Sequence, residues 1–272
     1  MTVTVSPDAR SWIERLARAG FAAKGIVYLL IGTLALLAAA GAGGETTGTH
    51  GALGVVLRQP LGRVLLALLA VGLAGYAMWR AITALADPEG QGRRGWKRIM
   101  VRIGYGISGL IHAGLAWEAA KLALALGGSG GGDAAQDRTA ELMSAPFGPW
   151  LVGAVALGLA GYGLAQIRRG LRGDIDRRLA LGRLGPDEQR LVVRTARTGL
   201  AARGVVFLIM SGFLAKAALE HDPSEAGGLE EALQALRDQP YAPFLLGGVA
   251  LGLAAYGAFQ LVRARYRVIA TP

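Results

Sequence analysis

The chain has 272 residues, of which 53% are hydrophobic and 42 are glycine. Together with a mean hydropathy of +0.40, this composition excludes an ordinary water-soluble domain, whose surface could not hide so much apolar material. The formal net charge is +10, and the absence of cysteine excludes disulfides and thiolate chemistry.

Six apolar segments follow one another along the chain. Each is about twenty residues long, the length that a helix rising 1.5 Å per residue needs to cross a hydrocarbon core of roughly 30 Å. Alanine, leucine and glycine dominate them and the alternation typical of barrel strands is missing, so we expect an all-α polytopic membrane protein with six transmembrane helices. The segments are 20–40, 64–85, 103–126, 147–167, 199–219 and 241–262.

These segments form three copies of one two-helix unit. Each copy opens with Arg-x-Gly, and its second segment carries Gly-Leu-Ala followed by glycine or alanine and then tyrosine. Because each copy has an even number of spans, we expect three parallel repeats, related by a pseudo-threefold axis along the membrane normal. The predicted divisions are an amphipathic lead (1–17), repeat 1 (18–85), a cytoplasmic loop (86–101), repeat 2 (102–170), a basic loop (171–196), repeat 3 (197–267) and a tail (268–272).

Charge predicts the orientation. Most of the 29 Lys and Arg residues lie in the N-terminal lead, the connections between repeats and the C-terminal tail, whereas the other connections are acidic. The positive-inside rule therefore places both termini in the cytoplasm, with Arg18, Arg102 and Arg197 as anchors at that face. The expected partner of these charges is a bilayer with anionic head groups. Nucleic acid is not expected, because no stacking aromatics are interleaved with the basic runs.

Small residues and a tyrosine recur at equivalent positions and predict close packing between helices. A second interpretation is that the three tyrosines surround a central cavity and offer their hydroxyl groups to a ligand. The positions expected to pack the repeats are Gly20, Gly72, Gly75, Tyr76, Gly104, Gly158, Gly161, Tyr162, Gly199, Gly252 and Tyr256.

Two further patterns precede each second span. A proline lies twelve residues before the glycine of each second span, at Pro60, Pro146 and Pro240, and can start the helix because it lacks an N–H group. Short apolar patterns come just before these prolines, which indicates short helices at the outer interface.

Ionisable residues within the spans mark a candidate polar site. Lys24 and Arg203 occupy equivalent positions, with Ser108 in the middle repeat, and the favoured interpretation is that their long side chains snorkel back toward the nearer membrane face or pair with the C-terminus of a neighbouring helix. His112 stands where the other repeats have Tyr28 and Phe207.

Glu118 follows the histidine by six residues and is likewise confined to the middle repeat. Ser108, His112 and Glu118 could form a proton or cation path. The favoured alternative is structural: an ion pair between Glu118 and Lys121, and a hydrogen bond from His112 to a neighbouring tyrosine.

Motifs for catalysis are missing from the sequence. The glycine-rich segment 127–132 lacks the Lys-Ser/Thr of a phosphate-binding loop, and His50 and His221 have no second ligand at metal spacing. We therefore expect no enzyme, no cofactor and no metal site.

The three copies of Arg-x-Gly and Gly-Leu-x-x-Tyr, the proline before each second span and the ending Arg263, Arg265, Tyr266 and Arg267 resemble a bacterial family called domain of unknown function 1206. The resemblance covers residues 18–267; Gln166, Ile167 and Ala255 depart from the pattern. It implies a six-span protein of the bacterial inner (plasma) membrane and transfers no activity.

Two functions stay open at this point. The first is a small channel or transporter that moves an ion or small molecule through a central or inter-repeat cavity. The second is a non-catalytic scaffold or accessory subunit that binds a membrane-protein partner or lipid.

Overall fold

The computed structural model describes residues 7–86, 95–126, 134–172, 175 and 179–269, so the predicted glycine-rich segment lies outside the described residues. Six long helices carry most of the chain, and each is long and apolar enough to cross a membrane. They are α1 (Pro7–Ala39), α3 (Gly62–Ala86), α4 (Trp96–Ala123), α6 (Gly148–Arg172), α7 (Pro186–Glu220) and α9 (Ala242–Tyr266). The predicted all-helical membrane protein is confirmed.

Three short helices lie in the predicted outer connections: α2 (Thr49–Leu57), α5 (Ala134–Met143) and α8 (Leu229–Arg237). Two of them contribute to the core instead of only covering the surface, because Leu53 of α2 and Leu233 of α8 are fully buried. Each second span follows directly after one of these helices.

The prediction that a proline starts each second span is wrong by two residues. The helices begin at Gly62, Gly148 and Ala242. The residue between proline and helix takes a left-handed conformation in all three repeats, with φ of 61°, 61° and 65° at Leu61, Phe147 and Tyr241. This turn changes the direction of the chain before the helix begins.

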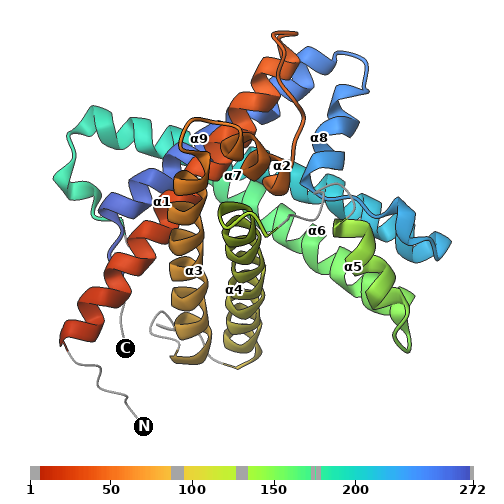
Figure 1. Ribbon diagram of the computed structural model, residues 1–272, viewed down its shortest axis with the longest axis horizontal. Helices are drawn as coiled ribbons and strands as arrows, with labels where there is room; N and C mark the ends of the chain where they lie inside the picture. Colours follow the sequence, from red (N-terminus) through yellow and green to blue (C-terminus); the bar gives the residue numbers. More distant parts are fainter. Residues whose placement is uncertain (1–6, 87–94, 127–133, 173–174, 176–178, 270–272) are drawn as a thin grey trace.

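The strongest packing unites helices of different repeats. The first helix of each repeat packs on the second helix of the preceding one, which gives the pairs α3–α4 and α6–α7, and α1 packs on α9 to complete the series. In Figure 1 the α3–α4 pair stands upright, and the α1–α9 and α6–α7 pairs cross it obliquely. The three repeats are thus bound to each other in a circuit.

Glycine permits this close pairing at an equivalent point of each pair. Gly25 of α1 faces Gly257 of α9, and a Cβ on Gly25 would lie 2.9 Å from the carbonyl oxygen of Gly257. Gly204 of α7 meets Gly163 of α6 in the same way. In the α3–α4 pair, Gly109 lies against the backbone of α3 with slightly more room.

Among the described residues, the two long helices of one repeat pack on each other in the first and third repeats only. α1 packs on α3 and α7 packs on α9, whereas α4 and α6, both described over their whole length, do not pack against each other. The described contacts therefore follow the threefold pattern between repeats but not inside the second repeat.

The second repeat departs at the residues that make this contact elsewhere. A Cβ on Gly20 would overlap the backbone of Tyr76, but the equivalent Gly104 has open space around it. Ala23 and Ala202 contact the glycine of the second helix in repeats 1 and 3, and the larger Ile107 stands at this position in repeat 2. A branched side chain there keeps two helix backbones apart.

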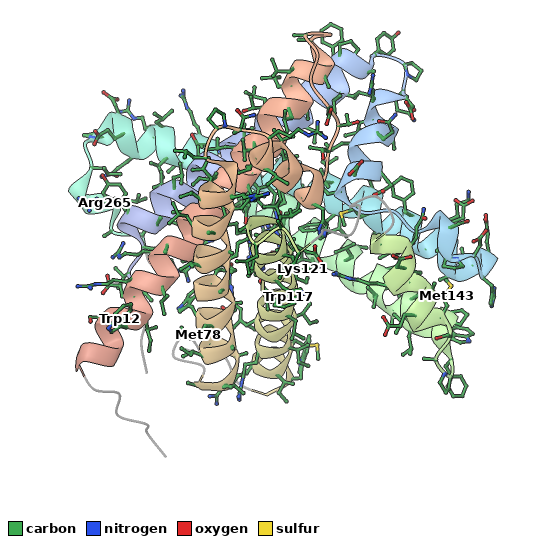
Figure 2. The ribbon with its side chains drawn as sticks, in the orientation of Figure 1. Trp12, Met78, Trp117, Lys121, Met143 and Arg265 are labelled. Carbon is green, nitrogen blue, oxygen red and sulfur yellow. The ribbon has the colours of Figure 1, made fainter. Side chains whose placement is uncertain are left out.

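The outer faces of the helices are apolar. Trp12, Met78 and Trp117 are exposed, and Figure 2 shows their positions on the outer parts of α1, α3 and α4. Apolar side chains on an exterior surface are what a helix bundle presents to lipid tails.

We predict that Gly20→Ala destabilises the protein by about 1–3 kcal/mol, because the added methyl group has no room beside Tyr76. The matched control is Gly104→Ala, which fills open space and should be neutral or gain up to about 1 kcal/mol in helix propensity. Reversible unfolding in mixed detergent micelles, followed by circular dichroism, measures both. Equal losses for the two variants would contradict the described difference between the repeats.

Candidate functional site

The arginine that opens each repeat binds the end of the preceding second helix. Arg102 donates to the carbonyl oxygens of Ala84 and Leu85 on α3, at 2.6 and 2.8 Å. Arg197 donates to those of Gly170 and Leu171 on α6, both at 3.0 Å. We call this repeated contact the arginine clasp.

Arg18 makes the third clasp and completes the circuit. It donates to the carbonyl oxygens of Ala264 and Arg265 on α9, both at 2.7 Å, and pairs with Glu14 at 2.7 Å. The last carbonyls of a helix lack partners and lie at the negative end of its dipole, so a guanidinium is a favourable cap. The anchors predicted for lipid head groups therefore serve the protein's own backbone.

Nearly three turns farther along the first helices, three pairs of rings meet. Each pair joins a first helix to the tyrosine of the preceding second helix, with centroids 4.5–5.2 Å apart. The pairs are Tyr28 with Tyr256, His112 with Tyr76 and Phe207 with Tyr162. All six spans contribute one ring, which explains how equivalent positions of three repeats arrive at one place.

Arg203 of α7 lies among these rings and is buried. Its Nε donates to the hydroxyl of Tyr28 at 3.2 Å, and its Nη1 donates to that of Tyr162 at 3.1 Å. The guanidinium carbon also lies 4.6 Å from the ring of Phe207 and 4.8 Å from that of Tyr256. Tyrosine oxygens and aromatic faces thus surround a cation from several sides.

Lys24 of α1 is the second buried cation. Its Nζ lies 5.1 Å from the ring of Tyr76 and 5.9 Å from that of Tyr256. The preference for snorkelling is therefore wrong: Lys24 and Arg203 are 5% and 9% exposed and stay among the rings. Arg80 of α3 lies beside them and donates to the Tyr76 hydroxyl through Nε at 2.9 Å and Nη2 at 2.6 Å.

His112 takes part in this aromatic–cation cluster through its ring. Its Nδ1 donates to the carbonyl oxygen of Ser108 at 2.7 Å, one turn earlier on α4, and its ring packs against Tyr76. The favoured structural interpretation expected a hydrogen bond to a tyrosine; the contact with tyrosine is instead between rings. Ser108 serves through its backbone.

Glu118 lies apart from the cluster. Its carboxylate pairs with Lys121 at 2.8 Å, as the structural alternative predicted. The structure thus unites Lys24, Tyr28, His112 and Arg203 of the predicted polar site but leaves Glu118 in a separate ion pair.

Sequence reasoning missed Arg80 and Phe207 as members of the cluster. Both carry a signal at helical spacing: Arg80 follows Tyr76 by four residues, and Phe207 is the equivalent of Tyr28 and His112. Residues four apart on a helix lie on one face, so the spacing predicts that Arg80 lies beside Tyr76.

The repeat pattern has counterparts in other proteins. The family model described as Domain of Unknown Function (DUF1206) matches the chain three times, at residues 19–87, 103–173 and 198–267. The chain belongs to the DUF1206 family. The uncharacterized protein YxxB of Bacillus subtilis (strain 168) is 33% identical over 265 residues, which cover 97% of this chain and 94% of YxxB. No solved structure matches.

The clasp leads to a first prediction for this region. Arg197→Ala should lower the free energy of unfolding by about 1.5–3 kcal/mol, because two carbonyls of α6 lose a charged donor. Arg194→Ala, an exposed arginine on the same helix, should change it by less than about 0.5 kcal/mol. Unfolding titrations in micelles compare the two, and a clasp without structural value would give them the same small effect.

The cluster leads to a second prediction. Tyr28→Phe and Tyr162→Phe each remove one acceptor of Arg203 and should each destabilise by about 1–3 kcal/mol. The loss of stability in the double variant should differ from the sum of the two single losses, because both hydroxyls accept from one guanidinium. Tyr241→Phe on the exposed turn before α9 is the control. If both cluster variants unfold like this control, the hydroxyls do not hold Arg203.

Proposed function

We propose that this DUF1206 protein binds a small anion at the aromatic–cation cluster and moves it across the membrane, as a channel or transporter. The observation that supports this proposal is the burial of Lys24 and Arg203 between the spans. Among the described residues their electrostatic partners are tyrosines and other cations, and no carboxylate forms an ion pair with either.

Lys24 and Arg203 carry charge inside spans that are apolar enough to cross a membrane. A cationic side chain at the centre of a span costs several kcal/mol unless it is compensated, and such residues usually mark an ion or substrate path. Aromatic faces and neutral hydroxyls compensate only part of this cost, about 0.5–2 kcal/mol for each cation–π contact. An anion would supply the remaining countercharge for Lys24 and Arg203 together.

We also propose a specific arrangement of the three repeats. Three parallel repeats about a pseudo-threefold axis would bring the same residue of each repeat to that axis, and the three ring pairs agree with this arrangement. The distribution of Lys and Arg supports a topology with both termini in the cytoplasm, and the family resemblance supports a location in the bacterial inner membrane.

A second candidate function has its own observation in favour. The sides of α4 and α6 that correspond to the packed sides in repeats 1 and 3 are open, since a Cβ on Gly104, Gly158 or Gly161 would meet no atom within 4 Å. Small residues on an open helix face admit close approach of another molecule. An accessory subunit that binds a membrane protein or a lipid would use this face.

We predict that sodium salts of small anions stabilise the protein, because the anion binds Lys24 and Arg203. The probes are chloride, nitrate, acetate and benzoate at constant ionic strength, with gluconate as the reference anion. A specific anion at a hundred times its dissociation constant should raise the free energy of unfolding by about 2.7 kcal/mol. Arg203→Gln and Lys24→Gln should abolish the increase, and Lys216→Gln, at a half-exposed outer lysine, should keep it.

Efflux of the stabilising anion from proteoliposomes tests movement. We expect flux with the natural protein and with Lys216→Gln, and loss of flux with Arg203→Gln. An identical salt response in all variants would overturn the anion site. Stabilisation without any flux would overturn the transport part.

A further inference from the structure

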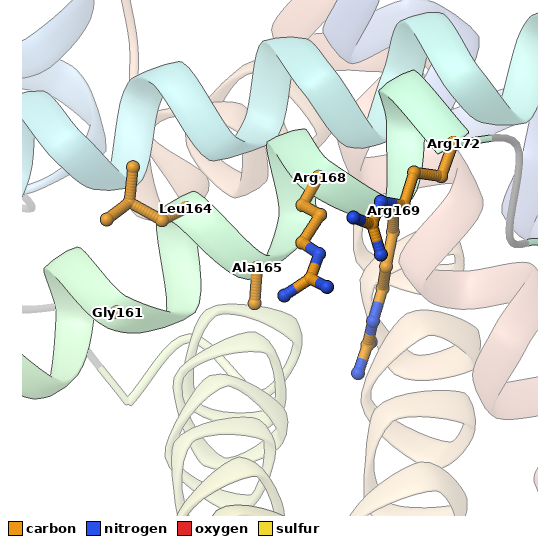
Figure 3. A pocket seen from close by; sticks show the side chains of 6 residues that line it. All are labelled: Gly161, Leu164, Ala165, Arg168, Arg169 and Arg172. Carbon is orange, nitrogen blue, oxygen red and sulfur yellow. The ribbon is translucent and has the colours of Figure 1, made fainter.

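A hollow of about 460 Å³ lies on one face of α6. Six residues at helical spacing line it, from the middle of the span to the end that carries the clasp: Gly161, Leu164, Ala165, Arg168, Arg169 and Arg172. In Figure 3 the three guanidinium groups extend to the same side of α6, away from α7. No ion pair to a described carboxylate holds any of these arginines.

The other repeats show what normally covers this face. In repeats 1 and 3 the same face packs on the first helix, and Trp79 and Phe259, the equivalents of Ala165, are buried there. In repeat 2 the first helix, α4, does not cover it. The sequence of the face changes with its environment. The equivalents of the three arginines are Ile82, Thr83 and Ala86 in repeat 1, and Val262, Arg263 and Tyr266 in repeat 3.

We propose that this face of α6 binds an anionic phospholipid, with the phosphate on Arg168, Arg169 and Arg172 and an acyl chain along Leu164 and Gly161. The lining runs over twelve residues, about 16 Å of helix, from three positive charges to an apolar stretch of a membrane span. A ligand that matches it must be anionic at one end and apolar along its length. A basic pocket between spans at the basic end of a bundle suits a phospholipid head group.

The ligand follows from charge and position together. A free inorganic anion would bind the arginines but would make no apolar contact with Leu164 or with the open surface at Gly161. A water-soluble acidic peptide would not enter the apolar part of the span. This site is distinct from the aromatic–cation cluster, so its test is independent of the proposed transport.

Native mass spectrometry of the full chain in mild detergent, titrated with phosphatidylglycerol and with phosphatidylcholine, tests the proposal. We expect one tightly retained phosphatidylglycerol and no comparable retention of phosphatidylcholine. The triple variant Arg168→Gln, Arg169→Gln, Arg172→Gln should weaken this binding about a hundredfold, at about fivefold for each arginine. The charge-matched control is Arg190→Gln, Arg194→Gln, Arg265→Gln, three exposed arginines at the same end, which should keep the lipid.

A second variant leaves the charge unchanged. Leu164→Trp fills the exposed hollow and should release the lipid while the protein stays monodisperse on gel filtration. Equal weakening by both triple variants would overturn the site in favour of diffuse surface charge. Full competition by millimolar inorganic phosphate, with normal lipid retention by Leu164→Trp, would overturn the lipid in favour of a free anion.

Discussion

The architecture depends on the arginine clasp, in which the first residue of each repeat caps the last carbonyls of the preceding repeat's second helix. A carbonyl without a partner is costly next to lipid, and a guanidinium can satisfy two at once. The clasp also sets the register of each pair. Seven residues after the arginine a glycine reaches the partner backbone, and ten residues after it a ring reaches the partner tyrosine. One contact at the end of a helix therefore positions the whole interface above it.

This register explains why charge gathers in the middle of the bundle. Position six after the clasp is lysine, serine or arginine, and it lies just below the ring pairs. Where the repeat places a cation there, tyrosines from two different repeats lie within its reach. The aromatic rings reduce the free energy needed to bury Lys24 and Arg203, and no described carboxylate forms an ion pair with either side chain. The aromatic residues that pack neighbouring helices together thus also surround the cations of the candidate site.

The spans, the short outer helices and the triplication could be predicted from sequence, because hydropathy and repetition do not depend on which helices touch. The pairing could not. Repetition shows that Tyr76 and Tyr256 are equivalent, but not that the ring partner of each comes from the next repeat along the circuit. The same limit explains the wrong preference for snorkelling at Lys24 and Arg203: a long cation near a span end can reach out or turn inward, and only the neighbouring rings decide between them. The left-handed conformation of Leu61 could not be predicted either, because it depends on the angle between α2 and α3.

The second repeat shows how a symmetric plan acquires an opening. Its clasp, its ring pair and its contact with the first repeat are all kept, so α4 and α6 are each held firmly by other repeats. The packing contact between α4 and α6 is therefore the one that can be absent while both helices stay held by other repeats. Ile107 in place of alanine disfavours close contact between the two backbones, and the arginines on α6 lie on an exposed face that α4 does not cover. The closed repeats have no equivalent trio of arginines, so the open face and its positive charge occur together in this chain, which is the combination that the proposed phospholipid site requires.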